Sequence, residues 1–309
     1  MYSAASTRGS ALFIFDSEKG KRRGPEMKIG YQGVRGAFSE SAIRTYVNSE
    51  YDHVIKDAEY ETVGYSDFIN MLQDVDAGRL DCAFFPVENT TTGIIARTYD
   101  YFQYYNVYAV GEVVEPIRQN LIVNPGTKLE EIKTVYSHPE ALSQCSVFFR
   151  NNPDIKPIAY EDTALAVEFV KESGDKSKAA IASALAADIY DMEILQEAVQ
   201  DSSSNMTRFL IISNKEDYPE NADKVSIYFV TGHVPGALYN ALGVFAALGI
   251  NVLKLESRPI IGKVFEYCFY LDFAGNLNEP NVAEAIRRLK YDCLELIVFG
   301  NYKSSPLAL

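Results

Sequence analysis

Three short polar segments could bind and polarise an anionic substrate through neutral hydroxyl and amide groups. Residues 86–93 (PVENTTTG) place an amide and three hydroxyls after an apolar run, residues 137–145 read SHPEALSQC, and residues 207–209 (TRF) stand where another apolar run begins. Such groups stabilise developing negative charge by donating hydrogen bonds. Each segment alone is equally typical of a structural turn or helix cap, so the chemistry depends on whether the fold brings them together.

Other catalytic and cofactor motifs do not fit the sequence. Gly30, Gly33 and Gly36 have the spacing G-x-x-G-x-x-G, which differs from the dinucleotide fingerprint and predicts a tight turn before a helix. The chain has no P-loop, G-x-S-x-G or H-E-x-x-H sequence, and its three histidines are too few for a multi-histidine centre. We therefore expect no cofactor and no metal.

The negative charge is concentrated in residues 27–223. The whole chain carries −13; residues 1–26 carry +2 and residues 224–303 carry +1, which leaves −16 for the segment between them. An acidic protein is a poor partner for nucleic acid or an anionic membrane, so neither is expected. If the acidic segment binds an anion, local donors must do so: neutral hydroxyls and amides, an arginine, and the helix N-termini expected after Gly33 and Ser137.

The cysteines and the hydropathy indicate a protein of a reducing compartment without a membrane helix. The four cysteines are scattered without C-x-x-C spacing, which suits reduced packing residues, and the uncharged stretch 225–253 contains too many polar residues for a bilayer helix. Residues 1–26 predict a flexible extension, with a transit peptide as the alternative. We expect a cytoplasmic protein, or a plastid one if residues 1–26 are a transit peptide.

From Met27 onward, short apolar runs alternate with helical patterns. Ser66 is expected to cap one helix, and Pro139 to begin another. The alternation predicts an α/β domain over residues 27–213 with a largely parallel sheet, in which ligands bind beyond the carboxyl ends of the strands. The turns at Asn89, Ser137 and Ser183 are then expected at one cleft.

A second domain follows a polar linker. Residues 214–223 contain a proline and show no periodicity, which is typical of a linker. Residues 224–303 alternate in the order βαββαβ, the split-βαβ arrangement.

Taken in order, seven segments resemble the prephenate dehydratase family with a C-terminal ACT regulatory domain. They are GVRGAFS (33–39), PVENTTTG (86–93), SHPEALSQC (137–145), AAIAS (179–183), TRF (207–209), GALY (236–239) and ESRP (256–259). The resemblance implies a two-lobed catalytic domain like a periplasmic solute-binding protein at 27–213 and a ferredoxin-like ACT domain at 224–303. It leaves no room for a fused chorismate mutase domain, so a monofunctional form is expected.

Two positions depart from the family pattern. Thr90 stands where the family commonly has Ser, which keeps a hydroxyl, whereas Leu253 stands where it commonly has Thr. The second change removes a hydroxyl near the implied effector site, so the strength of feedback control is left open.

The resemblance implies conversion of prephenate to phenylpyruvate with loss of carbon dioxide and water. Expelling hydroxide needs a hydrogen-bond donor or proton source. The motifs carry this role to Thr207, with Asn89, Ser137 and Gln144 as further catalytic residues. A threonine hydroxyl is a weak acid, so positioning and electrostatic stabilisation are favoured over simple general-acid catalysis. The substrate-binding residues implied are Thr90, Ser183, Arg208 and Phe209.

The resemblance also implies feedback inhibition by L-phenylalanine bound between ACT domains of paired subunits. A homodimer or homotetramer is therefore expected. The residues carried over to the phenylalanine site are Gly236, Ala237, Leu238, Glu256, Ser257, Arg258 and Pro259.

Two alternatives stay open. An arogenate dehydratase would use the aminated substrate with the same machinery, and a non-catalytic sensor would join a two-lobed binding domain to an ACT domain. The Thr207, Asn89, Ser137 and Gln144 set favours an enzyme over the sensor.

Overall fold

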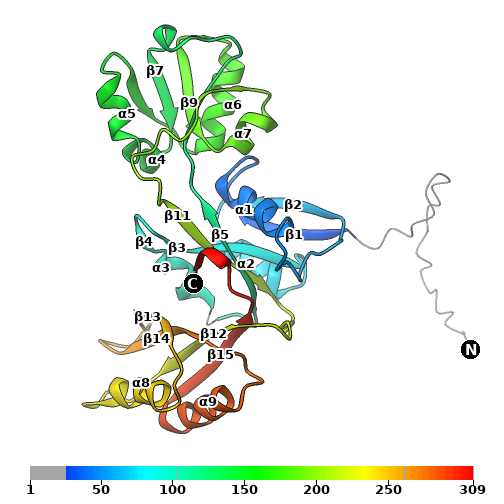
Figure 1. Ribbon diagram of the computed structural model, residues 1–309, viewed down its shortest axis with the longest axis vertical. Helices are drawn as coiled ribbons and strands as arrows, with labels where there is room; N and C mark the ends of the chain where they lie inside the picture. Colours follow the sequence, from blue (N-terminus) through cyan, green and yellow to red (C-terminus); the bar gives the residue numbers. More distant parts are fainter. Residues whose placement is uncertain (1–25, 103, 261, 309) are drawn as a thin grey trace, which may run out of the picture.

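Three units follow one another along the long axis of the molecule (Figure 1). The computed structural model describes residues 26–102, 104–260 and 262–308. Two α/β lobes come from residues 27–213, and a C-terminal ferredoxin-like unit comes from residues 224–302. The predicted fold class is confirmed. The predicted flexible extension, apart from Glu26, lies outside the described residues.

Lobe 1 is the middle unit and contains both early and late segments of residues 27–213 (Figure 1). Its strands lie in the order β5-β11-β3-β1-β2, and β4 pairs with β3. The elements are β1 (Met27–Gln32), α1 (Phe38–Val47), β2 (Tyr60–Tyr65), α2 (Phe68–Asp76), β3 (Cys82–Asn89), β4 (Gly93–Ile94), α3 (Ala96–Phe102), β5 (Tyr108–Pro116) and β11 (Met206–Ser213).

Lobe 2 is a continuous insertion between β5 and β11 and has its own five-stranded sheet in the order β10-β6-β9-β7-β8. Its elements are β6 (Asn120–Val123), η1 (Leu129–Glu131), β7 (Thr134–Ser137), α4 (Pro139–Ser143), α5 (Ser146–Asn151), β8 (Lys156–Ala159), α6 (Thr163–Ser173), β9 (Lys178–Ala182), α7 (Ala184–Ile189) and β10 (Glu193–Gln196).

Both lobe sheets are mixed, so the prediction of a largely parallel sheet was wrong. In lobe 1, β1 is parallel to β2 and β3, but β11 is antiparallel to β3 and β5; in lobe 2, β6 is antiparallel to β9 and β10. The chain leaves lobe 1 at the end of β5 and re-enters it at the start of β11. Because these two strands are neighbours, they necessarily run in opposite directions.

The C-terminal unit joins the sheet of lobe 1. Its strand order is β13-β14-β12-β15, and β15 lies beside β5 through the pair Gly300 and Ala109. A Cβ at Gly300 would lie 2.4 Å from the Ala109 carbonyl oxygen, so this close approach requires glycine. The elements are β12 (Lys224–Val230), α8 (Ala237–Ala247), β13 (Val252–Pro259), β14 (Tyr267–Ala274), α9 (Pro280–Asp292), β15 (Glu295–Tyr302) and η2 (Pro306–Ala308).

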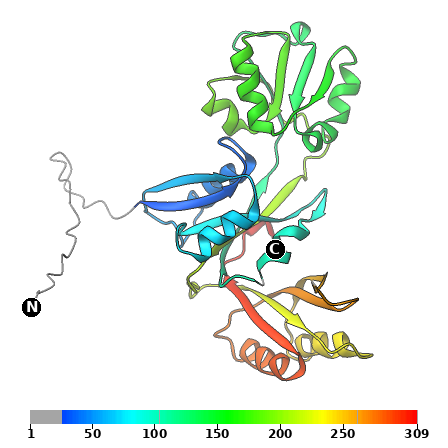
Figure 2. The same ribbon diagram turned by 180° about the vertical axis from the view of Figure 1, so that it is seen from behind.

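The two faces of the C-terminal sheet have different partners. One apolar face, including Phe229 and Phe273, packs on α8 and α9. The other, including Tyr228 and Tyr270, packs on lobe 1 through Tyr99 of α3. Seen from behind, η2 returns from the end of β15 to lobe 1 (Figure 2). The C-terminal unit is therefore docked on the lobe that carries β3 and β11.

Two local predictions need correction. Asp67, not Ser66, is the N-cap of α2, and its carboxylate accepts from the backbone amide of Asn70. The single helix expected after Pro139 is divided into α4 and α5, with Gln144 and Cys145 between them. An ionised carboxylate is a strong acceptor for a helix N-terminal amide, which explains the choice of Asp67.

The turn between β1 and α1 contacts lobe 2. Ser183 Oγ, which caps α7, donates to the Gly36 carbonyl oxygen at 2.6 Å. Gly36 has φ +92°, and a Cβ built there would lie 3.0 Å from the Ala186 Cα atom. Glycine therefore serves both the turn conformation and the close approach of the lobes.

Gly36→Ala should lower the free energy of unfolding by about 2–4 kcal/mol, through backbone strain and overlap with α7. Gly93→Ala is the matched control, because Gly93 has φ +82° but no atom within 4 Å of a built Cβ. Urea denaturation of both variants separates strain from overlap. Equal losses would contradict a close contact at Gly36.

Candidate active site

Asn89, Thr207 and Glu115 form a buried row across three neighbouring strands of lobe 1. Thr207 on β11 pairs directly with Asn89 on β3 and with Glu115 on β5, both antiparallel. Directly opposed residues of antiparallel strands point to the same face of the sheet. Asn89, Thr207 and Glu115 are 8%, 7% and 6% exposed, respectively. An amide, a hydroxyl and a carboxyl thus lie together where the strands approach lobe 2.

The orientation of Asn89 follows from its hydrogen bonds. Its Oδ1 accepts from the backbone amides of Thr91 at 2.8 Å and Thr92 at 3.0 Å, which fixes the turn after β3. Its Nδ2 therefore faces β11 and donates to Thr207 Oγ1 at 2.9 Å. Because the Thr207 oxygen accepts this bond, its hydroxyl proton is available for another acceptor.

A chain of amide groups connects this row to lobe 2. Asn89 Nδ2 also donates to Asn205 Oδ1 at 2.9 Å, and Asn205 Nδ2 donates to Gln144 Oε1 at 2.9 Å. Asn205 lies on the segment that crosses back to lobe 1, whereas Gln144 follows α4. The structure thus brings together Thr207, Asn89 and Gln144, three of the four side chains expected to be catalytic.

Ser137 and Ser183 have structural partners. Ser137 is fully buried, and its Oγ donates to the Ile181 carbonyl oxygen at 2.5 Å. Ser183 is 2% exposed and bonds to Gly36 and to the Ala186 amide. Both hydroxyls hold strand ends and the lobe contact, and their implied substrate roles stay predictions.

The other implied substrate-binding residues, Thr90, Phe209 and Arg208, also have partners within the chain. Phe209 is 2% exposed and belongs to the core of lobe 1. Thr90 Oγ1 donates to the Ser204 carbonyl at 2.6 Å and accepts from the Met206 amide at 3.0 Å, so it fastens two chain segments together. Arg208 follows Thr207 on a strand and therefore points to the opposite face.

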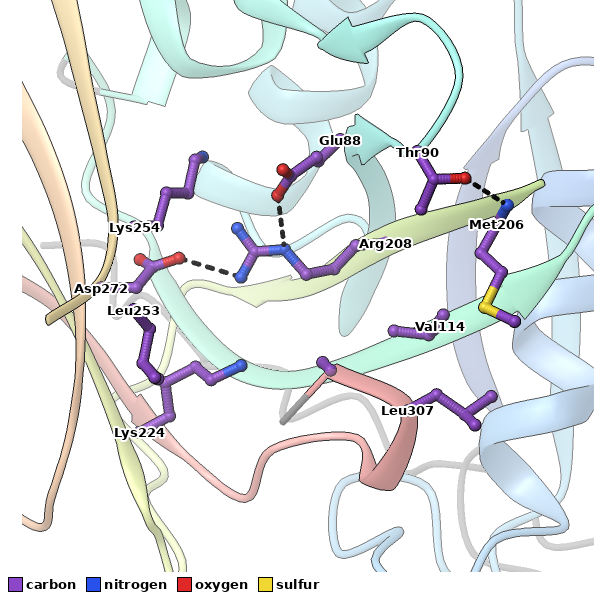
Figure 3. A pocket seen from close by; sticks show the side chains of 11 residues that line it. Glu88, Thr90, Val114, Met206, Arg208, Lys224, Leu253, Lys254, Asp272 and Leu307 are labelled. Carbon is purple, nitrogen blue, oxygen red and sulfur yellow. Dashed lines mark hydrogen bonds and ion pairs between the residues drawn. The ribbon is translucent and has the colours of Figure 1, made fainter. Parts of the chain in front are cut away.

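Arg208 lines a cavity between lobe 1 and the C-terminal unit. The cavity has a volume of about 270 Å³ and is also lined by Glu88, Thr90, Lys254 and Asp272 (Figure 3). Burial lowers the pKa of Lys254 to about 8, although nearby Asp272 opposes that shift. This junction cavity lies on the reverse side of β11 from Thr207, so it is separate from the Asn89–Thr207–Glu115 row.

One expected anion site is already occupied by the chain. The Gly36 amide, just before α1, donates to Glu40 Oε2 at 2.6 Å. A carboxylate at a helix N-terminus satisfies the local donors and the helix dipole. The α1 N-terminus therefore has an internal anion, and α4 after Ser137 spans only five residues.

The segments expected to bind an effector meet at one end of the C-terminal sheet. Val230, which precedes the turn into α8, and Arg258 on β13 both pair with Cys268 on β14. Gly236 has φ +83° and is the N-cap of α8, followed by Ala237 and Leu238. The α8 N-terminus and the carboxyl end of β13 therefore lie at the same end of the C-terminal sheet.

Strand alternation divides the ESRP segment between two faces. Glu256 and Arg258 lie on the face toward lobe 1, whereas Ser257 and Pro259 lie on the side of α8 and are exposed. Arg258 makes a two-pronged ion pair with Asp100 of α3, at 2.7 and 2.8 Å. The four residues therefore do not share one face of the sheet, and the implied phenylalanine contacts stay a prediction.

Two side chains near Thr207 were missed by the sequence prediction. Asn205 is two residues before Thr207, so strand alternation could have placed it on the same face. Glu115 lies on β5, for which no strand was predicted. The sequence does hint at it: Glu112 interrupts the otherwise apolar run 109–114, and Glu115 follows that run directly.

Neither a membrane span nor a metal cluster is found in the part of the chain that the structure describes. No helix there has both the length and the apolarity needed to cross a bilayer. Over the same residues, no group of three or more His, Cys, Asp or Glu side chains is arranged to hold a metal ion.

Comparison with known proteins identifies the family. The family model for "Prephenate dehydratase" matches residues 29–217. Arogenate dehydratase 2 of Petunia hybrida is 35% identical, covering 91% of this chain and 73% of that enzyme. Two solved structures resemble the fold. One is described as GqqA, a novel type of quorum quenching acylase, with a TM-score of 0.81, 30% identity and coverage of 91% and 100%. The other is prephenate dehydratase with L-Phe from Arthrobacter aurescens, with a TM-score of 0.78, 27% identity and coverage of 90% of each chain.

The family model spans more than half of the chain, and its match contains the Asn89–Thr207 pair and Gln144. The relatives extend the similarity through the C-terminal unit. This chain therefore belongs to the prephenate dehydratase family of lyase-type dehydratases.

Proposed function

We propose that the chain converts prephenate to phenylpyruvate, carbon dioxide and water. The observation that carries this proposal is the Asn89–Thr207 pair and its amide chain to Gln144, because it supplies neutral donors at the meeting point of two lobes. The substrate is a dianion, and the surrounding domain is acidic. Preorganised neutral hydroxyl and amide donors can bind an anion there through hydrogen bonds.

Thr207 is the donor to the departing ring hydroxyl. Asn89 donates to Thr207 Oγ1, which orients the threonine hydroxyl so that its proton points away from the amide. That hydroxyl can then donate to the leaving oxygen, where negative charge develops as the carbon–oxygen bond breaks. Aromatisation of the ring supplies the driving force once the ring carboxylate departs as carbon dioxide.

Arogenate is the second candidate substrate, since the Petunia relative is named an arogenate dehydratase. Purified protein incubated with each substrate at neutral pH distinguishes the two candidates by the ratio of kcat/KM. A higher value on prephenate supports the first proposal, and a higher value on arogenate replaces it. Turnover of neither substrate by folded protein would favour the non-catalytic sensor.

The C-terminal unit is proposed to be an ACT domain that binds L-phenylalanine and pairs two subunits. The support is the ferredoxin-like topology, the joint position of Gly236 and Ser257, and the L-Phe complex of the Arthrobacter protein. The outer strand β13 also exposes Leu253 and Leu255. Sedimentation with and without phenylalanine tests for a dimer or tetramer.

The cysteines bear on the compartment. Free Cys82, Cys145, Cys268 and Cys293 favour a reducing compartment such as the cytoplasm.

Arg258→Gln should weaken inhibition by phenylalanine several-fold while phenylalanine still binds. The ion pair between Arg258 and Asp100 connects β13 to α3, so its removal uncouples the effector strand from lobe 1. Inhibition curves and calorimetric binding measure the two properties separately. Asp100→Asn should reproduce the effect, and unchanged inhibition in both variants would contradict this route of coupling.

A further inference from the structure

The proposed reaction consumes one proton, and Thr207 is a poor source of it. Prephenate is a dianion, whereas the products are the phenylpyruvate monoanion, carbon dioxide and water, so one proton must join the departing hydroxide. An unassisted threonine hydroxyl is far too weak an acid to give up its proton readily at neutral pH. The site therefore needs a second group that can replace the proton Thr207 donates. This inference rests on the function proposed above.

Glu115 lies where such a group is needed. It is paired directly across β5 and β11 with Thr207, on the face where Asn89 reaches the threonine hydroxyl. The residue is 6% exposed. The two oxygens accept from Ser41 Oγ and Thr45 Oγ1 of α1, each at 2.6 Å. Helix α1 thus holds the buried carboxyl of the residue that stands opposite the threonine in the sheet.

The Ser41 and Thr45 hydroxyls that donate to Glu115 are neutral. The two charged residues of α1 nearest to it are Glu40, which binds the Gly36 amide, and Arg44, which lines a surface hollow with Tyr31 and Glu61. On β5, Glu112 points to the opposite face and pairs with Arg208, which is also directed away from Thr207. Burial raises the pKa of the Glu115 carboxyl above its ordinary value, although the Ser41 and Thr45 hydroxyls oppose the shift.

Binding of the substrate should favour the protonated form of Glu115. A dianion beside a carboxyl disfavours the charged carboxylate, so binding raises the proton affinity of Glu115 further. A neutral carboxyl also avoids repelling the substrate. Glu115 is therefore suited to hold a proton when the substrate is bound.

We propose that Glu115 is the proton reservoir for Thr207 in the dehydration step. The bond between the ring and its carboxylate breaks, and that electron pair enters the ring as carbon dioxide leaves. The ring carbon–oxygen bond breaks, and the departing oxygen takes the Thr207 Oγ proton to form water. Thr207 Oγ takes a proton from the Glu115 carboxyl, which becomes a carboxylate and is reprotonated from solvent. Glu115 acts through Thr207 and is a positioning and proton-supplying residue.

The pH dependence of kcat tests this role. Activity of the wild-type protein should fall as pH rises through the pKa of Glu115 in the substrate complex, because the carboxyl must be protonated to donate. Glu115→Gln keeps the size of the side chain but cannot supply a proton. It should lower kcat by about 10²-fold and abolish that alkaline limb, with little change in KM. Glu130→Gln, an exposed change in lobe 2, should leave both unaltered.

A second variant separates proton supply from structural support. Glu115→Asp retains a carboxyl group but shortens the side chain by one methylene. It should therefore show the alkaline limb that Glu115→Gln lacks, with a kcat below that of the wild type. Thermal unfolding establishes that each variant is folded. If Glu115→Gln keeps the wild-type rate and pH limb, or if Gln and Asp variants behave alike, the relay is wrong. If the wild-type protein turns over neither prephenate nor arogenate, the proposed function fails and the relay fails with it.

Discussion

Replacing Thr207 by alanine should lower kcat/KM for dehydration by about 10²- to 10⁴-fold without unfolding the protein. The substitution removes the hydroxyl that accepts from Asn89 Nδ2 at 2.9 Å and is free to donate to the leaving group. The loss should fall mainly on kcat, because the donated bond strengthens as the carbon–oxygen bond breaks. Formation of phenylpyruvate, followed by its absorbance in alkali, measures the rate.

Thr207→Ser is the matched control for this experiment. Serine retains the hydroxyl at the same position in β11, so kcat should stay within about tenfold of the wild type. Thr207→Val replaces the hydroxyl by a methyl group of the same size and should be as inactive as Thr207→Ala. An active Thr207→Val variant would remove Thr207 from the mechanism.

Asp272→Asn should lower the free energy of unfolding by about 3 kcal/mol, because it leaves buried positive charge without its partner. Asp272 is 4% exposed; it accepts from Arg208 Nη1 at 2.9 Å and from Ser226 Oγ at 2.6 Å. Arg208 also forms an ion pair with Glu112, and Glu112 forms a second ion pair with Lys224 at 2.6 Å. This charged cluster joins β5 and β11 of lobe 1 to the C-terminal unit.

The pH dependence of stability has a definite sign at Asp272. Burial alone would raise the pKa of its carboxyl, but Arg208 and Lys254 hold that pKa below the ordinary value of 3.8. A group whose folded pKa is depressed stabilises the fold above its unfolded pKa, and this contribution is lost as pH falls through the folded value. As pH is lowered from 5, the free energy of unfolding of the wild type should therefore fall by more than that of Asp272→Asn.

A surface ion pair provides the comparison. Lys28 and Glu61 lie 3.1 Å apart with side chains 55% and 45% exposed, so Glu61→Gln should cost at most about 1 kcal/mol. Urea unfolding of both variants at neutral pH measures the difference. A loss at Asp272 no larger than that at Glu61 would show that the cluster does not stabilise the junction.

The polar segments were recognisable without the structure, and part of their arrangement was too. Asn89 and Thr207 were expected at a common site, and they share a hydrogen bond across β3 and β11. Gln144 joins them through Asn205, which was not expected. Ser137 and Ser183 show the limit of motif reasoning, because a hydroxyl at a strand end can equally cap a helix or bind a buried carbonyl.

Strand order and direction were less predictable. The run 108–116 contains two glutamates, so its apolar pattern is interrupted and β5 was not anticipated. Its glutamates are accommodated because each has partners from distant segments: Ser41 and Thr45 for Glu115, and Lys224 for Glu112. Such pairing is a property of the folded sheet, and no local pattern reports it.

The amino-acid sequence by itself determined the α/β class, the ferredoxin-like order of the C-terminal unit, and the chemical character of the site, neutral donors in an acidic domain. These follow from local periodicity and residue type. Only the tertiary structure decided that Glu115 faces Thr207, that Arg208 faces the C-terminal unit, and that Arg258 binds Asp100. The reason is physical: alternation assigns neighbouring residues to opposite faces, but the packing of distant strands decides what each face meets.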